Sequence, residues 1–183
     1  MSNRWIYELV HSLVEKYQTR DPEQLAEELN VKIRYFTETE SLLGMYKVIL
    51  RNRFIFIPTN LGPLKKTVLA HELGHDQMHR EYCKNGASFH ENKIFNPTNQ
   101  YEIEANIFAA HLLIPDEEVR RLIKYANSDR ELAAELEVDI NLLHLKISEM
   151  AKMNLLDLDQ TYLERPDSQF LKDYQRLDEW DEH

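Results

Sequence analysis

Two histidines and a glutamate in the pentapeptide His71-Glu72-Leu73-Gly74-His75 have the types and the spacing for metal chemistry. Residues four apart on a helix lie one turn apart on the same face, so both imidazoles can point at one ion. Zinc binds imidazole nitrogen at about 2.0–2.1 Å. Glu72 would stand beside the first ligand, where its carboxylate can accept a proton from a zinc-bound water. The pentapeptide therefore predicts a zinc site with its own general base.

The pattern specifies only three residues, and the alternative is an exposed helix that carries two histidines without a metal. The residues before the motif favour a helix whose histidines face inward. Gly62-Pro63 marks a turn, and no proline follows it until after Met78. Leu64 and Val68 share one helical face with the two histidines, at the spacing i, i+4, i+7 and i+11. We therefore expect the histidines to continue an apolar stripe that faces the protein interior.

A catalytic zinc ion needs a third protein ligand and leaves its fourth position to water. His79 lies about 12 Å from His71 along the helix axis, too far to share one metal. It could instead orient a ligand or contact substrate, or simply pack. Cys83 is another possible donor, which we interpret as a plain loop thiol. The richer candidate segment is 101–115, a predicted helix that ends before its last residue, a proline.

Two glutamates of this second helix compete for the third ligand position. Glu102 and Glu104 point about 200° apart, so only one of them can face the metal easily. Small residues beside Glu102 would let the helix approach the motif helix closely. Asn106, on the same face as Glu102, could hold a ligand histidine by its other ring nitrogen. Without the upstream motif, each glutamate would be interpreted as a solvated surface residue.

Taken together, the two segments resemble the ImmA/IrrE family of zinc metallopeptidases over about residues 20–150. The resemblance rests on Leu69-Ala70-His71-Glu72-Leu73-Gly74-His75 and on Glu102-x-x-Ala105-Asn106-x-Phe108-Ala109-Ala110-x-Leu112-Leu113-Ile114-Pro115. It implies a gluzincin-like site in which His71, His75 and Glu102 bind Zn²⁺ and Glu72 is the catalytic base. It also implies a supporting role for His79.

The same resemblance implies a substrate class. Members of the family are typically encoded by bacteria or phages. The better-known ones cleave, or relieve repression by, helix-turn-helix repressors of the Xre type. An anti-repressor that acts on such a protein is therefore the function that the resemblance implies.

The remaining patterns predict an α+β fold, a minimal zincin-like domain with a small three-stranded antiparallel sheet, a zinc-binding helix and C-terminal helices. Strands are expected at 31–36, 45–50 and 54–57, with a hairpin turn at Arg51-Asn52. Pro58 suits the end of an edge strand, and such an edge could bind an extended substrate by adding it to the sheet. The alternative is an ordinary sheet with no substrate role. Helices are expected at 4–17, 22–29, 64–78, 101–114, 117–126, 129–136 and 139–152.

Charge and composition narrow the class of partner. The 183 residues carry a formal net charge of −10, which argues against direct binding to nucleic acid. Residues 132–147 resemble half of a helix-turn-helix but contain Lys146 as their only strong cation, so we interpret them as helix packing. No apolar stretch reaches 18 residues and no signal pattern opens the chain. We therefore expect no membrane segment and a cytoplasmic location, consistent with a single cysteine.

We expect one metallopeptidase domain over residues 1–156 and an acidic tail over 157–183. The tail holds nine acidic and three basic residues, a difference of −6, and an apolar helical face follows Pro166. We expect it to be helical in part. It could dock on the domain, bind a partner or lie over the cleft.

These features predict a zinc-dependent endopeptidase with a protein substrate. Glu72 would remove a proton from the attacking water and deliver it to the leaving amine. Tyr82, His90 and Tyr101, in or beside the long polar stretch 80–100, are candidates for stabilising the carbonyl oxyanion. The alternative function is a non-catalytic regulator that binds and displaces a repressor, with zinc serving the fold or a sensing role. The oligomeric state is left open.

Overall fold

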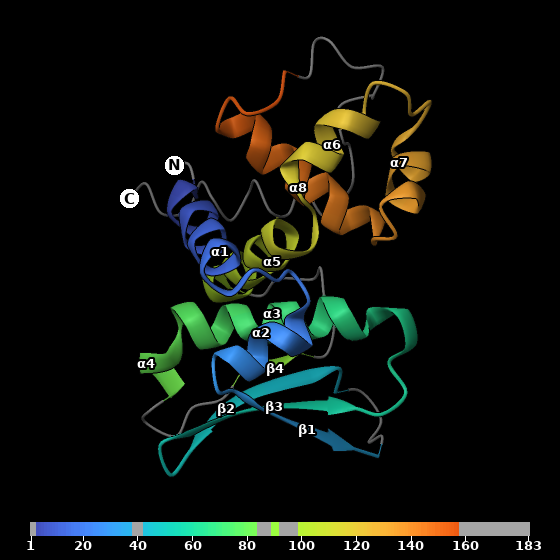
Figure 1. Ribbon diagram of the computed structural model, residues 1–183. Coiled ribbons are helices and arrows are strands. Elements are labelled where there is room, and N and C mark those ends of the chain that lie inside the picture. Colours follow the sequence, from blue (N-terminus) through green and yellow to red (C-terminus); the bar gives the residue numbers. More distant parts are fainter. Residues whose placement is uncertain (1–2, 38–41, 84–88, 92–98, 158–183) are drawn as a thin grey trace.

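The computed structural model describes residues 3–37, 42–83, 89–91 and 99–157, in which helices are stacked on one face of a small sheet (Figure 1). The mixture of helices and a short sheet confirms the expected α+β class. All but the first residue of the expected acidic tail lies outside the described residues. Its helical content and its position therefore stay predictions, as does the domain boundary.

Within the described residues the sheet has four strands, in the order β1-β3-β2-β4. They are β1 (Lys32–Phe36), β2 (Gly44–Ile49), β3 (Asn52–Pro58) and β4 (Phe89–Glu91). Strand β1 runs parallel to β3, whereas β2 is antiparallel to both β3 and β4. The expected three-stranded antiparallel sheet is therefore wrong in strand number and in one direction. Apolar alternation indicates where a strand lies, but it does not determine which neighbour the strand pairs with.

Pro58 ends an interior strand, not the edge strand that we expected. It is the last residue of β3 and stands opposite Phe36 of β1. Proline has no N–H group, so Pro58 cannot donate a hydrogen bond to a neighbouring strand. The next residue, Thr59, donates its N–H to the Phe36 carbonyl at 3.1 Å, so the missing donor lies at the end of the pairing. Because β3 is flanked on both sides, it cannot add an extended substrate. Among the described strands, β1 and β4 form the edges.

The hairpin between β2 and β3 is present, one residue earlier than predicted. Ile49 pairs with Asn52, so Leu50 and Arg51 form a two-residue turn. Both turn residues have positive φ, 48° and 64°, as a type I′ turn requires. The prediction of a hairpin is therefore confirmed, and only its central residues change.

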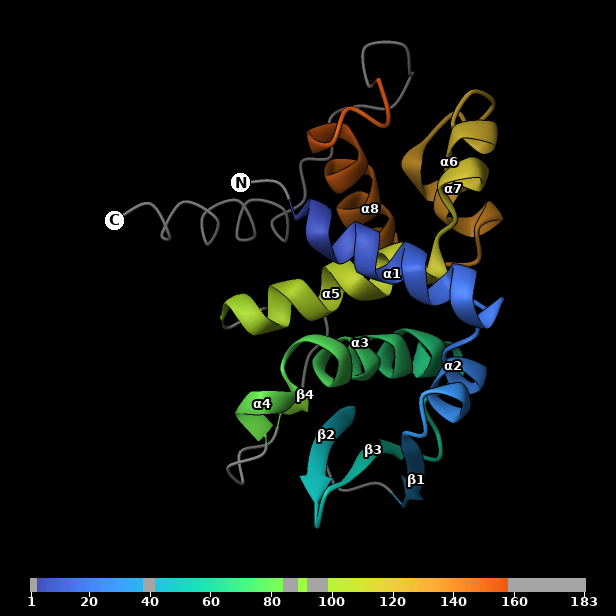
Figure 2. The same ribbon diagram turned by 60° about the vertical axis from the view of Figure 1, so that its left-hand side comes forward.

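Helix α3 (Lys65–Met78) carries the pentapeptide and lies across one face of the sheet. It is preceded by a 3₁₀ turn, η1 (Gly62–Leu64). Helix α5 (Gln100–Leu113) covers the opposite side of α3, as Figure 2 shows. Residues 67–76 are therefore buried all round, and α3 is a central helix, not an amphipathic one. Leu64, expected in its apolar stripe, lies in the turn and is 39 % exposed.

Two N-terminal helices close the layers around α3 and α5. Helix α1 (Arg4–Tyr17), as predicted, buries an apolar face and crosses α5 (Figure 2). Helix α2 (Pro22–Glu28) packs beside α3 and begins at an N-cap, Asp21, whose carboxylate accepts the N–H groups of Glu23 and Gln24. Proline at its first position needs no hydrogen-bond partner there. These local signals explain why both helices lie close to their predicted positions.

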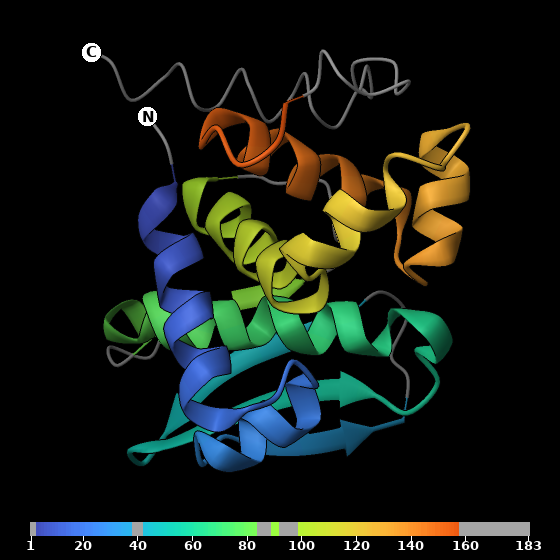
Figure 3. The same ribbon diagram turned by 45° about the horizontal axis from the view of Figure 1, so that its top comes forward.

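The remaining helices form the part of the molecule farthest from the sheet (Figures 1 and 3). They are α6 (Asp116–Leu122), α7 (Asp129–Glu135) and α8 (Ile140–Lys152), which follow the predicted order. A short α4 (Arg80–Cys83) follows α3, and Cys83 is buried at its end instead of lying in a loop. No helix in the described part of the chain is both long and apolar enough to span a bilayer.

Candidate metal centre

Three side chains from α3 and α5 bring their ligand atoms together. The Nε2 atoms of His71 and His75 are 3.0 Å apart. A carboxylate oxygen of Glu102 lies 3.1 Å from Nε2 of His71 and 3.6 Å from Nε2 of His75. The structure therefore groups the three residues that the resemblance implied, and Glu104 is not a member of the group.

The spacing of the three ligand atoms fits a tetrahedral ion. Ligands at about 2.0–2.1 Å from a zinc ion at tetrahedral angles are about 3.3 Å from one another. The three observed separations of 3.0, 3.1 and 3.6 Å bracket that value. The donor set, two imidazoles and one carboxylate, is also one that zinc accepts at catalytic sites. The residues present therefore fit a zinc ion.

The contact behind His71 determines which of its nitrogens can bind a metal. Its Nδ1 lies 2.9 Å from the side-chain oxygen of Asn106, which can only accept, so Nδ1 donates its hydrogen there. The lone pair of Nε2 then faces the carboxylate of Glu102. Two acceptors 3.1 Å apart repel unless a cation lies between them. Asn106 thus has the orienting position that the sequence predicted, and it directs Nε2 of His71 toward the shared centre.

Burial and neighbouring charges keep the ligands in their metal-binding protonation states. Burial lowers the pKa of His75 to about 3, so its imidazole is neutral at neutral pH. Burial alone would raise the pKa of Glu102. A proton or cation held between its carboxylate and the imidazoles of His71 and His75 outweighs burial and lowers that pKa below its usual range. A neutral imidazole and an ionised carboxylate are the forms that bind a divalent ion.

The carboxylate of Glu72 lies on the sheet side of α3, against the first residue of β2. A Cβ atom added to Gly44 would meet a carboxylate oxygen of Glu72 at 2.5 Å and a methyl group of Val68 at 2.7 Å. Only glycine leaves room for the carboxylate at this position. Sequence reasoning missed Gly44, although a glycine at a strand position often marks a close approach of other groups.

A second glycine lets α5 come close enough to α3 for Glu102 to reach the histidines. A Cβ atom on Gly74 would lie 3.1 Å from Cα of Ala105. This close approach confirms the expected role of the small residues on α5. The N-cap residue Asn99 also accepts the backbone N–H of Glu102, at 3.2 Å, and fixes the first turn of α5 there.

An ion-pair network that the sequence did not predict holds α3 on the sheet one residue after His75. Asp76 is fully buried and accepts from Arg53 of β3 at 2.8 Å. Arg80, one turn further along, contacts the same carboxylate oxygen at 3.4 Å. Because Asp76 is one turn after Glu72, this network sets the rotation of α3 and so the side to which Glu72 points. A single aspartate in a polar stretch carries no signal that would reveal such a contact.

Three other predicted site residues follow His75 in a row of aromatic rings. The His79 ring is 5.1 Å from that of His75 and 4.9 Å from that of Tyr101, which is in turn 5.5 Å from Tyr82, between ring centroids. The oxyanion role of the two tyrosines stays a prediction. The side chain of His90 lies outside the described residues. Cys83 is not one of the grouped ligands.

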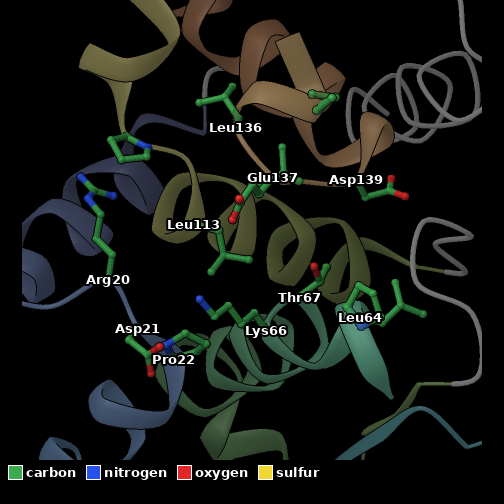
Figure 4. Close-up of a pocket in the computed structure, with 15 residues that line it drawn as sticks. Arg20, Asp21, Pro22, Leu64, Lys66, Thr67, Leu113, Leu136, Glu137 and Asp139 are labelled. Atoms are coloured by element: carbon green, nitrogen blue, oxygen red, sulfur yellow. The ribbon is translucent and has the colours of Figure 1, made fainter. Parts of the chain in front are cut away.

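A separate pocket of about 620 Å³ borders the start of α3 (Figure 4). Lys66 and Thr67 line it from α3, Arg20 from the segment before α2, and Glu137 and Asp139 from the turn between α7 and α8. None of the grouped ligands lines this pocket, and its charges are mixed. The pocket is therefore distinct from the candidate metal centre, which lies one helical turn further along α3.

Comparison with known proteins matches the part of the chain that contains this centre. Residues 26–148 match the family model Peptidase_M78, described as the IrrE N-terminal-like domain. The chain is also similar to the "uncharacterized immunity region protein 2" of Bacillus phage phi105, with 35 % identity over 154 residues. That alignment covers 80 % of this chain and 94 % of the phage protein. Both matches span the two helices that supply the grouped ligands.

Proposed function

Because the chain belongs to the Peptidase_M78 family with its IrrE N-terminal-like domain, we propose that it is a zinc-dependent endopeptidase. The observation that carries the proposal is the convergence of three acceptor atoms at tetrahedral spacing, with a buried glutamate next to the first ligand in the chain. His71, His75 and Glu102 would hold the ion. Both the ligand set and the neighbouring carboxylate are those of a hydrolytic zinc site.

The proposed chemistry divides between the ion and Glu72. A zinc ion supplies Lewis acidity, which lowers the pKa of water towards neutrality. The carboxylate of Glu72 accepts a proton from the attacking water and passes it to the leaving amine. Asn106 keeps His71 oriented throughout, and the Arg53–Asp76 pair keeps α3 in place on the sheet. General base catalysis by such a residue contributes about 10²- to 10⁴-fold to the rate.

The proposed substrate is a helix-turn-helix repressor of the Xre type, which would make the protein an anti-repressor. The name of the phage relative, an immunity region protein, supports this choice. Direct contact with DNA is not part of the proposal. Lys146, the only strong cation in the helix-turn-helix-like segment, is fully buried and paired with Asp116, so it cannot bind a phosphate group.

The test incubates the protein with the Xre-type regulator encoded beside its gene, with and without chelator, and identifies fragments by mass spectrometry. The wild type should cleave the regulator and lose this activity when zinc is removed. Glu72→Gln should keep its zinc and lose about 10²- to 10⁴-fold in rate. Glu117→Gln, which changes an exposed glutamate of α6, is the matched control and should cleave normally.

Two results would contradict the proposal. One is cleavage at the wild-type rate by zinc-loaded Glu72→Gln. The other is loss of repression while the regulator stays full length. The second result would favour a non-catalytic protein that binds and displaces its partner.

A further inference from the structure

A chain of polar contacts runs behind His75, on the side away from the other ligands. Nδ1 of His75 lies 2.9 Å from Nδ1 of His79. Nε2 of His79 in turn lies 2.8 Å from a carboxylate oxygen of Glu104. The His79 side chain is only 3 % exposed and that of Glu104 17 %, so water competes little for these contacts. The side chains of His79 and Glu104 thus connect the second histidine ligand to the N-terminal half of α5.

The direction of each hydrogen bond in this series of contacts follows from Glu104, where the series ends. The carboxylate of Glu104 accepts, so Nε2 of His79 carries the hydrogen that it donates. In a neutral imidazole the other nitrogen is then an acceptor, so Nδ1 of His79 must accept from His75. Nδ1 of His75 therefore carries its hydrogen, and the lone pair of its Nε2 is left for a metal ion. Each link selects one tautomer of the next ring, and no group needs to change its charge.

The two histidine ligands are thus oriented by different means. His71 donates directly to the side-chain oxygen of Asn106, one turn along α5 from Glu102. His75 reaches its final acceptor only through His79. In both cases the residue that decides the tautomer belongs to α5, the helix that also supplies Glu102. Close packing of α5 on α3 therefore sets all three ligands together.

We propose that Glu104 is a positioning residue of the metal centre, which acts through His79 to hold His75 in the tautomer that binds metal. The inference rests on the proposed function for its purpose, but the tautomer can be measured without activity. It assigns Glu104 a role other than metal ligand, and His79 a role other than substrate contact. Both ring nitrogens of His79 are engaged, one by His75 and one by Glu104.

The first test measures the histidine tautomers in the metal-free protein by ¹⁵N NMR of the ring nitrogens at neutral pH. In the wild type, His75 should carry its hydrogen on Nδ1 and His79 on Nε2. In Glu104→Leu, which removes the acceptor, the His75 signals should shift toward a mixture of both tautomers. Glu104→Gln offers an amide oxygen as acceptor and should retain the wild-type pattern.

The second test measures zinc affinity by competition with a chromophoric chelator. Loss of a group that orients a ligand typically weakens metal binding about 10- to 100-fold, and we expect this loss in Glu104→Leu. Glu104→Gln should stay within about threefold of wild type because its oxygen can accept the same hydrogen bond. Glu104→Ala repeats the removal without added bulk, in case leucine disturbs the fold.

The matched control is Gln100→Ala. Gln100 donates to the other carboxylate oxygen of Glu104, at 3.2 Å. Its loss therefore perturbs the same turn without breaking the hydrogen bonds that run from His75 through His79 to Glu104. Wild-type tautomers and zinc affinity in Gln100→Ala would support the proposal. Unchanged tautomers and affinity in Glu104→Leu and Glu104→Ala would overturn it. Equal losses in Glu104→Gln and Glu104→Leu, with lowered thermal stability in both, would also overturn it, because they would indicate a merely structural role. If the wild type binds zinc but cleaves nothing, the proposed function fails while both tests of Glu104 remain valid.

Discussion

Two of the buried groupings of histidine and carboxylate side chains in the described part of the molecule differ in where their positive charge comes from. In the centre formed by His71, His75 and Glu102, three acceptors face one another and no side chain of the group supplies a cation. In the second cluster, Nζ of Lys146 lies 2.6 Å from an oxygen of Asp116 and 3.0 Å from Nδ1 of His111. We call the first of these the open cluster and the second the closed cluster.

The closed cluster contains its own cation, Lys146. Its members come from α5, α6 and α8, and the Tyr7 hydroxyl of α1 donates to Asp116 at 2.8 Å. Burial lowers the pKa of Lys146 to about 8, which still leaves the amine mainly protonated at neutral pH. The cluster therefore joins four helices around a cation that the chain itself supplies. The comparison indicates that similar groups stabilise the fold in one cluster and, in our proposal, bind a metal ion in the other.

The largest expected effect on stability comes from removing the cation of the closed cluster. Lys146→Met leaves Asp116 buried without its main partner, and loss of one member of such a pair destabilises a protein by about 3–5 kcal/mol. Zinc affinity of the folded protein should not change, because the open cluster is untouched. Denaturant unfolding and zinc titration measure the two quantities.

Lys124→Met is the control for this prediction. Lys124 follows α6 and is exposed, so its replacement should change the free energy of unfolding by less than about 1 kcal/mol. A weakened zinc affinity in Lys146→Met would show that the two clusters are coupled, and the comparison would fail.

A smaller effect, on activity, is expected from Gly44, the glycine that faces the carboxylate of Glu72, the proposed general base. Gly44→Ala places a methyl group within 2.5 Å of Glu72, so the carboxylate must move. A shift of about 1 Å in a catalytic group can lower the rate about 10²-fold. Overpacking costs about 1–3 kcal/mol of stability as well.

Zinc affinity distinguishes this effect from general damage to the site. Gly44→Ala should bind zinc about as well as the wild type, because the atoms nearest to the added group belong to Glu72 and Val68 and not to a proposed ligand. Activity measured on the zinc-loaded variant gives the loss. A wild-type rate in Gly44→Ala would contradict the position that we assign to Glu72.

The parts of the site that follow helical periodicity could be predicted, and the parts that depend on tertiary contacts could not. Helical spacing places His71 and His75 on one face of their helix, and Glu102 and Asn106 on one face of the next. The structure brings these two faces together. Strand order, by contrast, depends on which side of β3 the chain crosses to, and no local pattern records that choice.

Gly44 was missed, and Glu104 was considered only as a ligand, for related reasons. A glycine before a predicted strand has no side chain to mark a site, and its role appears only when α3 lies against it. Glu104 points away from Glu102 on its own helix, so sequence reasoning treated it as the weaker ligand candidate. Its contact with His79 can be predicted only when the distance between α3 and α5 is known. Residues that act through a neighbour are thus harder to predict than the ligands themselves.

Zinc stoichiometry, measured by native mass spectrometry on wild type, His71→Leu and His111→Leu, tests the difference between the two clusters most directly. The variants remove one buried histidine from the open and from the closed cluster, respectively. We expect one zinc ion per chain in the wild type and in folded His111→Leu, and none in His71→Leu at the same free zinc concentration. Equal zinc binding by His71→Leu and the wild type, or no binding by the wild type, would contradict the account.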